Sequence, residues 1–177
     1  MNFAMDFLKN FSLEGKIAFV TGASYGIGFA IAKAFALAGA TIVFNDIKQE
    51  LVDKGLEAYK AEGINAKGYV CDVTDEDAVN ATVKKIEEEV GVIDILVNNA
   101  GCNIRKPALE VSWEDWNTVL DTNLRGSFFV AQAVAKKMIP RRYGRIINIG
   151  SVTSVFGYAG ITPYCASRGG VKQMTMS

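Results

Sequence analysis

Short apolar runs alternate with longer helical stretches along almost the whole chain, and this alternation restricts the possible folds more than any other feature. The apolar runs predict strands at residues 16–21, 41–45, 66–71, 93–97 and 145–149. The stretches between them predict helices at residues 26–37, 48–62, 74–90 and 112–139, with a last helix after Pro163. Strands that alternate with helices form right-handed βαβ units and therefore a parallel sheet. We predict an α/β fold of the Rossmann type, with a doubly wound sheet in the order 3-2-1-4-5 and helices on both faces.

Local signals mark the ends of several predicted elements. Thr74 with Asp77, and Ser112 with Asp115, have the spacing of a capping box at the start of a helix. Pro140 is expected to end the long helix that precedes it, because proline has no amide hydrogen to donate. The strands read as continuous apolar runs, so we expect each of them to be buried on both faces.

The composition allows one sizeable core. Half of the 177 residues are hydrophobic and 21% are charged, which is typical of a folded domain. Basic and acidic residues number 19 each, so the formal net charge is zero and we predict no nucleic-acid partner. The most apolar region, residues 27–44, is interrupted by Lys33 and Gly39, so we predict no membrane span. We predict a single domain over residues 1–177 that begins with a short leader, residues 1–12, and has no signal peptide.

The cysteine and histidine content narrows the chemistry. Cys71, Cys102 and Cys165 form no C-x-x-C pair, which favours reduced thiols and a cytoplasmic location over a disulfide scaffold. The chain has no histidine, which excludes a Ser-His-Asp triad, a Cys-His pair and any histidine-based zinc site. We predict no metal site, so the chemistry must come from other polar side chains or from a cofactor.

A glycine-rich turn joins the first predicted strand to the first predicted helix. Residues 21–28 read TGASYGIG, a G-x-x-x-G-x-G spacing that lets the backbone approach a pyrophosphate at the start of a helix. The alternative is a tight turn without a ligand. The cofactor-binding residues predicted in this turn are Gly22, Ser24, Tyr25, Gly26, Ile27 and Gly28.

Asp46 ends the second predicted strand, 18 residues after Gly28. A carboxylate at this place can accept both ribose hydroxyls of NAD and repel the 2′-phosphate of NADP. Tyr25 and Ile47 offer no positive charge for that phosphate, although Lys48 is close in sequence. We therefore favour NAD, with NADP possible; the alternative for Asp46 is a cap of the following helix.

Further motifs follow the later strands in a fixed order. Cys71-Asp72-Val73 ends the third predicted strand, and Asn98-Asn99-Ala100-Gly101 ends the fourth. Asn123 lies in the long predicted helix, and Tyr164 follows Ser151 by 13 residues. Together with the glycine turn, these motifs resemble those of the short-chain dehydrogenase/reductase family over essentially the whole chain.

The resemblance implies an NAD or NADP cofactor and assigns the residues around it. Gly22, Gly26 and Gly28 would cradle the pyrophosphate, and Asp46 would select the adenosine ribose. The other cofactor contacts that it implies fall on Asp72, Val73, Asn98, Ala100, Gly101, Tyr164 and Arg168.

The resemblance also implies a set of catalytic residues. Tyr164 would be the general acid/base, and Ser151 would polarise the carbonyl or hydroxyl of a small-molecule substrate. Asn123 would hold a water molecule in a proton relay. The alternative for Asn123 is a helix-kink residue that bonds to nearby backbone, and both roles can hold together.

One position departs from the Tyr-x-x-x-Lys pattern of the family. Arg168 stands four residues after Tyr164, so both side chains share one face of a helix. The family lysine bonds the nicotinamide ribose and stabilises the tyrosinate. A guanidinium keeps the positive charge, but it is larger and planar and cannot pass on a proton. We expect activity to be retained or reduced rather than lost.

Within the family, residues 39–55 and the Arg105-Lys106-Pro107 segment are similar to gluconate 5-dehydrogenases and related sugar-acid dehydrogenases. The implied reaction interconverts a secondary alcohol and a ketone, as in gluconate and 5-ketogluconate. Arg105 would pair with the substrate carboxylate, or else is a solvated loop arginine. Two alternatives stay open: a 3-oxoacyl thioester reductase, and a non-catalytic cofactor-binding or assembly subunit.

The resemblance carries two further expectations. Family members form oligomers, so a homodimer or homotetramer is expected; Trp113, Trp116, Phe128 and Phe129 suit either its interface or core packing. Family members also continue past the helix that contains Ser177, so the C-terminal portion of the fold is expected to be absent from this chain.

Overall fold

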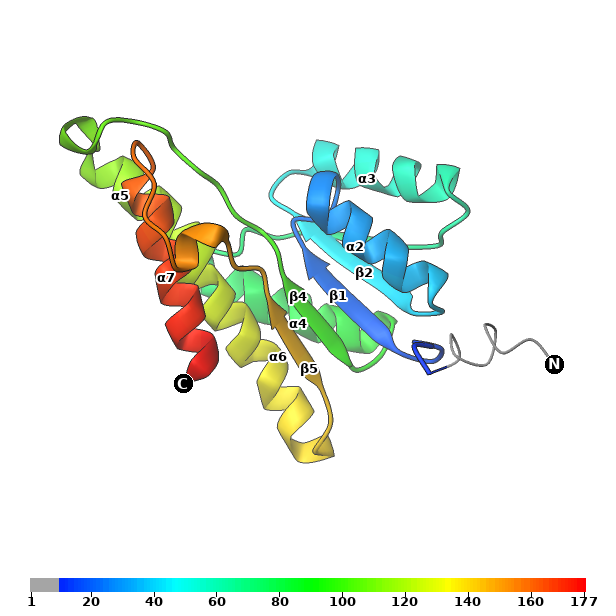
Figure 1. Ribbon diagram of the computed structural model, residues 1–177. Coiled ribbons are helices and arrows are strands. Elements are labelled where there is room, and N and C mark those ends of the chain that lie inside the picture. Colours follow the sequence, from blue (N-terminus) through cyan, green and yellow to red (C-terminus); the bar gives the residue numbers. More distant parts are fainter. Residues whose placement is uncertain (1–9) are drawn as a thin grey trace.

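The computed structural model describes residues 10–177 and is built on a five-stranded parallel sheet (Figure 1). The strands are β1 (Ile17–Thr21), β2 (Thr41–Asp46), β3 (Lys67–Val70), β4 (Ile95–Asn98) and β5 (Arg145–Asn148). Their order across the sheet is β3-β2-β1-β4-β5, which confirms the predicted order. The predicted leader falls largely on residues 1–9, which lie outside the described residues.

Helices cover both faces of this sheet (Figure 1). One face carries α2 (Gly26–Leu37) and α3 (Gln49–Ala61), and the other carries α4 (Glu76–Glu89) and α6 (Ser127–Arg141). The other helical elements are α5 (Trp113–Leu120), α7 (Thr162–Met176) and the short turns η1 (Ala108–Glu110) and η3 (Val152–Ser154). Among the described residues, no helix has the length and apolar character needed to cross a membrane.

Alternate strand residues point to opposite faces of the sheet, which explains the continuous apolar runs. Phe19 and Val43 belong to the apolar cluster that α4 and α6 cover. Val20 and Phe44 belong to the cluster that α2 and α3 cover. All four side chains are buried, and burying a side chain of this kind contributes about 1.5–3 kcal/mol. The core therefore holds the carboxyl ends of β1 and β2 in fixed positions.

The long helix predicted at residues 112–139 is interrupted in the structure. It divides into α5, a π-helical turn η2 (Asp121–Gly126), and α6. Pro140 does not end α6 but lies in its last turn, where a missing amide hydrogen removes only one helical bond. The helix ends because Arg142 adopts a left-handed backbone with φ of 53°.

The two predicted helix caps have different outcomes. Ser112 and Asp115 form the predicted capping box of α5. The prediction for Thr74 is wrong: its amide and hydroxyl both donate to the Asp72 carboxylate. Asp75, the next residue along, caps α4 instead by accepting a hydrogen bond from the amide of Ala78.

Strand β5 differs from its neighbour β4 in burial. Every residue of β4 is buried, whereas Ile146 and Ile147 of β5 are 37% and 42% exposed. Within the described part of the chain, β5 pairs with β4 alone and forms one edge of the sheet. At the other edge of the sheet, Lys67 and Val70 of β3 are also exposed. The expectation that all five strands are buried on both faces is therefore wrong for both edge strands, β3 and β5.

Candidate active site

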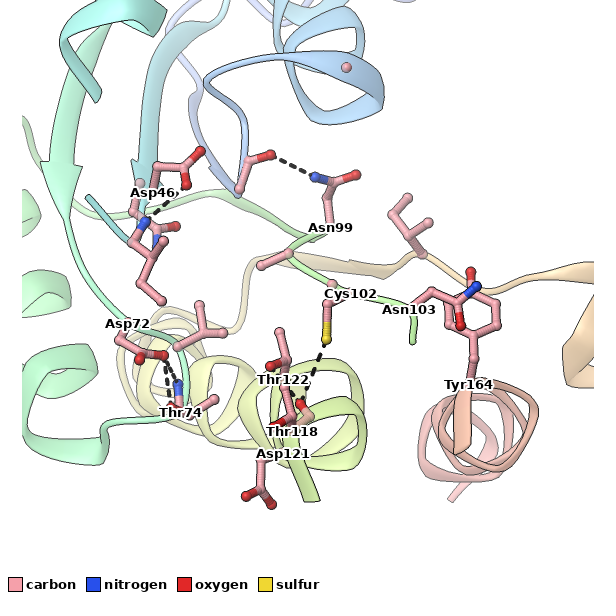
Figure 2. A pocket seen from close by; sticks show the side chains of 18 of the residues that line it. Asp46, Asp72, Thr74, Asn99, Cys102, Asn103, Thr118, Asp121, Thr122 and Tyr164 are labelled. Atoms are coloured by element: carbon pink, nitrogen blue, oxygen red, sulfur yellow. Dashed lines mark hydrogen bonds between the residues drawn. The ribbon is translucent and has the colours of Figure 1, made fainter. Parts of the chain in front are cut away.

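A cleft of about 1220 Å³ opens at the carboxyl ends of the strands. Open parallel sheets bind ligands at this place, where the chain connections diverge on the two sides of the sheet. Figure 2 shows Asp46 and Tyr164 on opposite sides of the cleft, with Asn99 and Cys102 between them. The predicted site residues that line the cleft are Gly22, Tyr25, Gly26, Ile27, Asp46, Asp72, Val73, Ala100, Gly101, Tyr164 and Arg168.

The glycine turn has no room for side chains at two of its three glycines. A Cβ atom on Gly22, whose φ is 62°, would lie 2.9 Å from the Cα of Ala100. A Cβ on Gly28 would lie 2.5 Å from the Asn99 amide nitrogen and 2.7 Å from the carbonyl oxygen of Gly22. Gly26 has a φ of 64°, and a Cβ atom there would meet no described residue within 4 Å. This bare backbone, at the start of α2, fits a pyrophosphate group.

Hydrogen bonds from neighbouring strands hold the glycine turn in place. The carbonyl oxygen of Asn45 accepts bonds from the amides of Gly22 and Ala23, at 3.0 and 3.3 Å. The Asn99 side-chain amide donates to the carbonyls of Thr21 and Gly22, both at 2.9 Å. These contacts join the carboxyl ends of β1, β2 and β4 into one rigid corner.

Asp46 and Asp72 line the same end of the cleft as this turn. One carboxylate oxygen of Asp46 accepts a bond from the amide of Ile47, at 2.9 Å. The side chains of Tyr25 and Ile47 also line the cleft here, and neither carries a positive charge. The arrangement suits a neutral diol better than a phosphate group, because nothing on these positions would neutralise a phosphate.

Tyr164 and Arg168 face the cleft from one side of α7. The Arg168 guanidinium carbon lies 5.1 Å from the centre of the Tyr164 ring. Its Nη1 donates to the carbonyl of Ile149 at 2.7 Å, whereas its buried Nε has no hydrogen-bond partner among residues 10–177. The side chain is only 5% exposed. A buried, partly unpaired cation therefore stands beside the phenol ring.

Asn123 lies in the π-helical turn and is completely buried, so it does not line the cleft. Its side-chain oxygen accepts a bond from the amide of Cys102 at 2.8 Å, and its nitrogen donates to the carbonyl of Cys102 at 2.9 Å. The same nitrogen donates to the Ser167 hydroxyl at 3.0 Å, and that hydroxyl donates to the carbonyl of Tyr164. The amide of Asn123 thus ties the loop after β4 to the first turn of α7.

Five other predicted site residues lie away from the lining of the cleft. Gly28 is buried at the start of α2. Ser24 belongs to the glycine turn but is buried and does not line the cleft. The Asn98 side chain points toward α6 and donates to the carbonyl of Ser127 at 2.9 Å. The Ser151 hydroxyl accepts a bond from the amide of Thr153, at 3.1 Å. Arg105 is exposed, with its guanidinium 5.9 Å from the ring centre of Tyr158.

Sequence reasoning missed several residues that line the cleft. Among them, Asn99 could have been found from the sequence. Neighbouring residues in a strand face opposite ways, so Asn98 and Asn99 cannot both face the glycine turn. The others lie at the end of β2, on loops, on α5 and on the turn η2, where no sequence period marks the cleft. They include Asn45, Thr74, Cys102, Asn103, Glu114, Asn117, Thr118, Asp121 and Thr122.

Comparisons with known proteins agree with one another. The family model described as short chain dehydrogenase matches residues 16–177. Gluconate 5-dehydrogenase of Gluconobacter oxydans (strain 621H) is 49% identical over 165 residues, which are 93% of this chain and 64% of that protein. The chain thus spans a little less than two thirds of the length of this relative.

Two solved structures are similar to the chain over nearly its whole length. 2-Keto-3-deoxy-D-gluconate dehydrogenase from Streptococcus agalactiae is 59% identical, with a TM-score of 0.82 over 97% of this chain and 65% of that chain. A gluconate 5-dehydrogenase from Burkholderia cenocepacia J2315, solved in complex with NADP and tartrate, is 43% identical, with a TM-score of 0.90 over 96% of this chain and 66% of that chain.

Proposed function

The chain belongs to the short-chain dehydrogenase family, and from this premise we propose that it takes part in NAD(P)-dependent oxidation and reduction of a sugar acid. The reaction would interconvert a secondary alcohol and a ketone. The observation that carries the proposal is one continuous cleft. The cleft has a bare glycine turn at one end and a tyrosine beside a buried cation at the other.

The residues at the first end of the cleft fit a dinucleotide. Gly22 and Gly26 line the cleft and would face the pyrophosphate. Gly28 is buried outside the cleft lining, and its missing side chain lets α2 pack closely against Asn99 and the Gly22 carbonyl. Asp46 would accept the hydroxyls of the adenosine ribose, and Asp72 lies beside it for the adenine. We favour NAD over NADP for this chain because no positive charge lies at Tyr25 or Ile47.

The residues at the second end would move the proton. A bound nicotinamide supplies the hydride acceptor or donor, and the protein supplies orientation and charge. In the oxidation direction the ionised Tyr164 oxygen would take the proton of the substrate alcohol, and Arg168 would stabilise the tyrosinate before that transfer. In the reduction direction the Tyr164 hydroxyl would donate its proton to the substrate oxygen, which leaves the tyrosinate beside Arg168. Ser151 would donate its hydroxyl hydrogen to the substrate oxygen while still accepting the bond from Thr153.

Asn123 would act at a distance from the reacting atoms. Through Ser167 it fixes the carbonyl of Tyr164, and through Cys102 it fixes the loop after β4. A role in holding a relay water would therefore use groups other than its side-chain amide, since the amide oxygen and nitrogen both have protein partners.

The names of the relatives support a substrate of the aldonic acid class, with chemistry at carbon 5 of gluconate as the first choice. A 2-keto-3-deoxy derivative is the second choice. Arg105 would attract the carboxylate from the rim of the cleft. A homodimer or homotetramer is part of the proposal, and the exposed Trp113 and Phe128 would lie in its interface.

The first test is a thermal melt of the chain alone and with saturating NADH or NADPH. A ligand present at 100 times its Kd stabilises a fold by about 2.7 kcal/mol, which moves the melting temperature by several degrees. We expect the larger shift with NADH. A sharp melt that neither nucleotide moves would contradict the proposal.

A turnover screen then tests the substrate class. It would compare 5-ketogluconate, 2-keto-3-deoxygluconate and a 3-oxoacyl thioester with the nucleotide that binds. Faster turnover of a keto acid supports the proposal, whereas faster turnover of the thioester replaces it with the 3-oxoacyl reductase. Nucleotide binding without turnover of any of them favours a non-catalytic subunit.

A further inference from the structure

Tyr59 is buried where α3 meets the glycine turn. Its ring is 0% exposed and lies between Phe29 of α2 and Phe44 of β2, with ring centres 4.5 and 5.0 Å away. Its hydroxyl donates a hydrogen bond to the carbonyl of Ala23, at 2.8 Å. A core tyrosine thus bonds to the backbone of the glycine turn.

This hydrogen bond fixes the orientation of one peptide group in the turn. A trans peptide is planar, so its carbonyl and the amide of the next residue point in opposite directions. With the Ala23 carbonyl directed at Tyr59, the Ser24 amide points away from α3. In the part of the chain that the structure describes, that amide has no acceptor. Tyr59 therefore sets the direction of a free donor in the turn.

Gly55 lies one helical turn before Tyr59 and faces the same region. A Cβ atom on Gly55 would lie 2.9 Å from both the Cα of Ser24 and the ring of Phe44. Glycine is disfavoured in the interior of a helix, so its presence in α3 needs a structural reason. The reason here is that α3 contacts the backbone of the glycine turn directly.

The same helix is connected to the carboxylate proposed for the ribose. Asp46 is the last residue of β2, and α3 begins at Gln49 after a short connection. A helix held at Gly55 and Tyr59 therefore keeps the turn and the carboxylate in a fixed relation. Burial raises the pKa of the Tyr59 hydroxyl above its ordinary value, so the hydroxyl remains a donor throughout the neutral range.

We infer that Tyr59 is a positioning residue for the dinucleotide site, an inference that rests on the proposed function. Tyr59 touches neither end of the cleft itself. It acts through the Ala23–Ser24 peptide and through the contact between α3 and the turn. Its loss should weaken dinucleotide affinity while leaving the chemical step almost unchanged.

The test replaces one hydroxyl and keeps the ring. Tyr59→Phe removes the bond to Ala23, and Tyr69→Phe is the matched control. Tyr69 is also buried, and its hydroxyl donates to the Glu89 carboxylate at 2.8 Å, away from the turn. Each variant of the full chain is compared with the wild type in thermal melts and in calorimetric titrations with NADH and NADPH.

We expect both variants to melt at a lower temperature, because each loses a hydrogen bond. Only Tyr59→Phe should bind the nucleotide more weakly, by about tenfold, which corresponds to the loss of one hydrogen bond. Its KM for the nucleotide should rise, while kcat at saturating nucleotide stays within about twofold of the wild type. A Kd within twofold of the wild type would overturn the inference and leave Tyr59 a stability residue.

A second variant covers the case in which Tyr59→Phe does not fold. Gly55→Ala keeps the hydroxyl but pushes α3 away from Ser24, and it should also weaken nucleotide binding. Unchanged binding in Gly55→Ala would overturn the inference. If the wild type itself binds neither nucleotide, the proposed function fails and this inference fails with it. If the wild type binds a nucleotide and both variants bind it equally well, this inference fails and the proposed function stands.

Discussion

The two ends of the cleft are built in different ways. At the glycine-turn end, β1 and β2 are buried on both faces, and the turn rests on strand backbone, on Asn99 and on Tyr59. At the Tyr164 end, β5 is half-exposed, and polar side chains hold α7 to the sheet and to the loop after β4. The Arg168 bond to Ile149 and the Asn123 bond to Ser167 are the main ones.

This difference separates binding from chemistry. The glycine turn has several supports, from Asn45, Asn99 and Tyr59, so the loss of one of them should weaken nucleotide binding without collapsing the turn. A helix held by a few directed hydrogen bonds depends on each of them, because each buried polar group left unpaired costs about 1–3 kcal/mol. We therefore expect the first end to set affinity and stability, and the second end to set the rate.

The largest expected effect is on kcat and should leave nucleotide binding at the other end of the cleft almost unchanged. Tyr164→Phe removes the proposed acid/base and should lower kcat by a factor of about 10²–10⁴. The Kd for the nucleotide should stay within about threefold, because the ring and Arg168 remain. Steady-state kinetics and calorimetry measure both numbers. An unchanged kcat would exclude Tyr164 as the acid/base.

The next effect tests the glycine-turn end. Gly28→Ala places a Cβ atom 2.5 Å from the Asn99 amide and 2.7 Å from the Gly22 carbonyl, so the corner must shift. We expect a loss of about 1–3 kcal/mol in the free energy of unfolding, together with weaker nucleotide binding. The control is Gly169→Ala in α7, where a Cβ atom would meet no atom of residues 10–177 within 4 Å. That change should be neutral or slightly stabilising in a denaturant melt.

A smaller effect is expected at Arg168. Arg168→Lys keeps the positive charge beside Tyr164, so kcat should hold or rise by a few-fold. Arg168→Met loses the charge and leaves the Ile149 carbonyl without its partner, so kcat should fall and about 1–3 kcal/mol of stability should be lost. A large fall in kcat for the lysine variant would mean that Arg168 does not take the place of the family lysine.

The smallest effect concerns the loop beside the Tyr164 end. Lys106 and Ser112 lower the pKa of Asp115 from its ordinary 3.8 to about 2. Because the folded-state pKa is the lower one, this contribution to stability is present above about pH 4 and is lost as the pH falls toward 2. Melting temperatures between pH 5 and 2 should fall less steeply for Asp115→Asn than for the wild type. Parallel curves would show that the pair adds nothing measurable.

The sheet and its strand order could be predicted from the sequence, because the spacing of apolar residues and the position of the glycine turn are local signals of strands, helices and their connections. The sequence could not predict which residues after each strand face the cleft. Asn98 was expected at the cofactor, yet its side chain points toward α6. The side chain of Asn99 instead donates a hydrogen bond to the Gly22 carbonyl of the glycine turn. The direction of a side chain at a strand end depends on register with neighbouring strands, which the residue types alone do not reveal.

The departures at the Tyr164 end have the same origin. The residues of the π-helical turn, Asp121–Gly126, do not differ in type from those of the helices around it in a way that marks a break. The long helix was therefore expected to be continuous. The partners of Arg168 and Asn123 come from segments about 20 residues away, in the Ile149 carbonyl and the Cys102 backbone. Tertiary contacts of this kind decide the role of a polar side chain, and sequence motifs mark only its position.

The strand order also sets the sequence of events during folding. β1 lies between β2 and β4, and the bond from the Ile17 amide to the Asp94 carboxylate joins residues 77 positions apart. At synthesis rates of roughly 5–20 residues per second, one edge of β1 waits about 4–15 s for its second neighbour. β1, β2 and β3 can associate first, and the backbone edge of β1 at Ala18, Phe19 and Val20 stays open to other chains until β4 pairs with it. We expect the yield of folded protein in cells to depend on whether the open edge of β1 is kept from other chains during that interval.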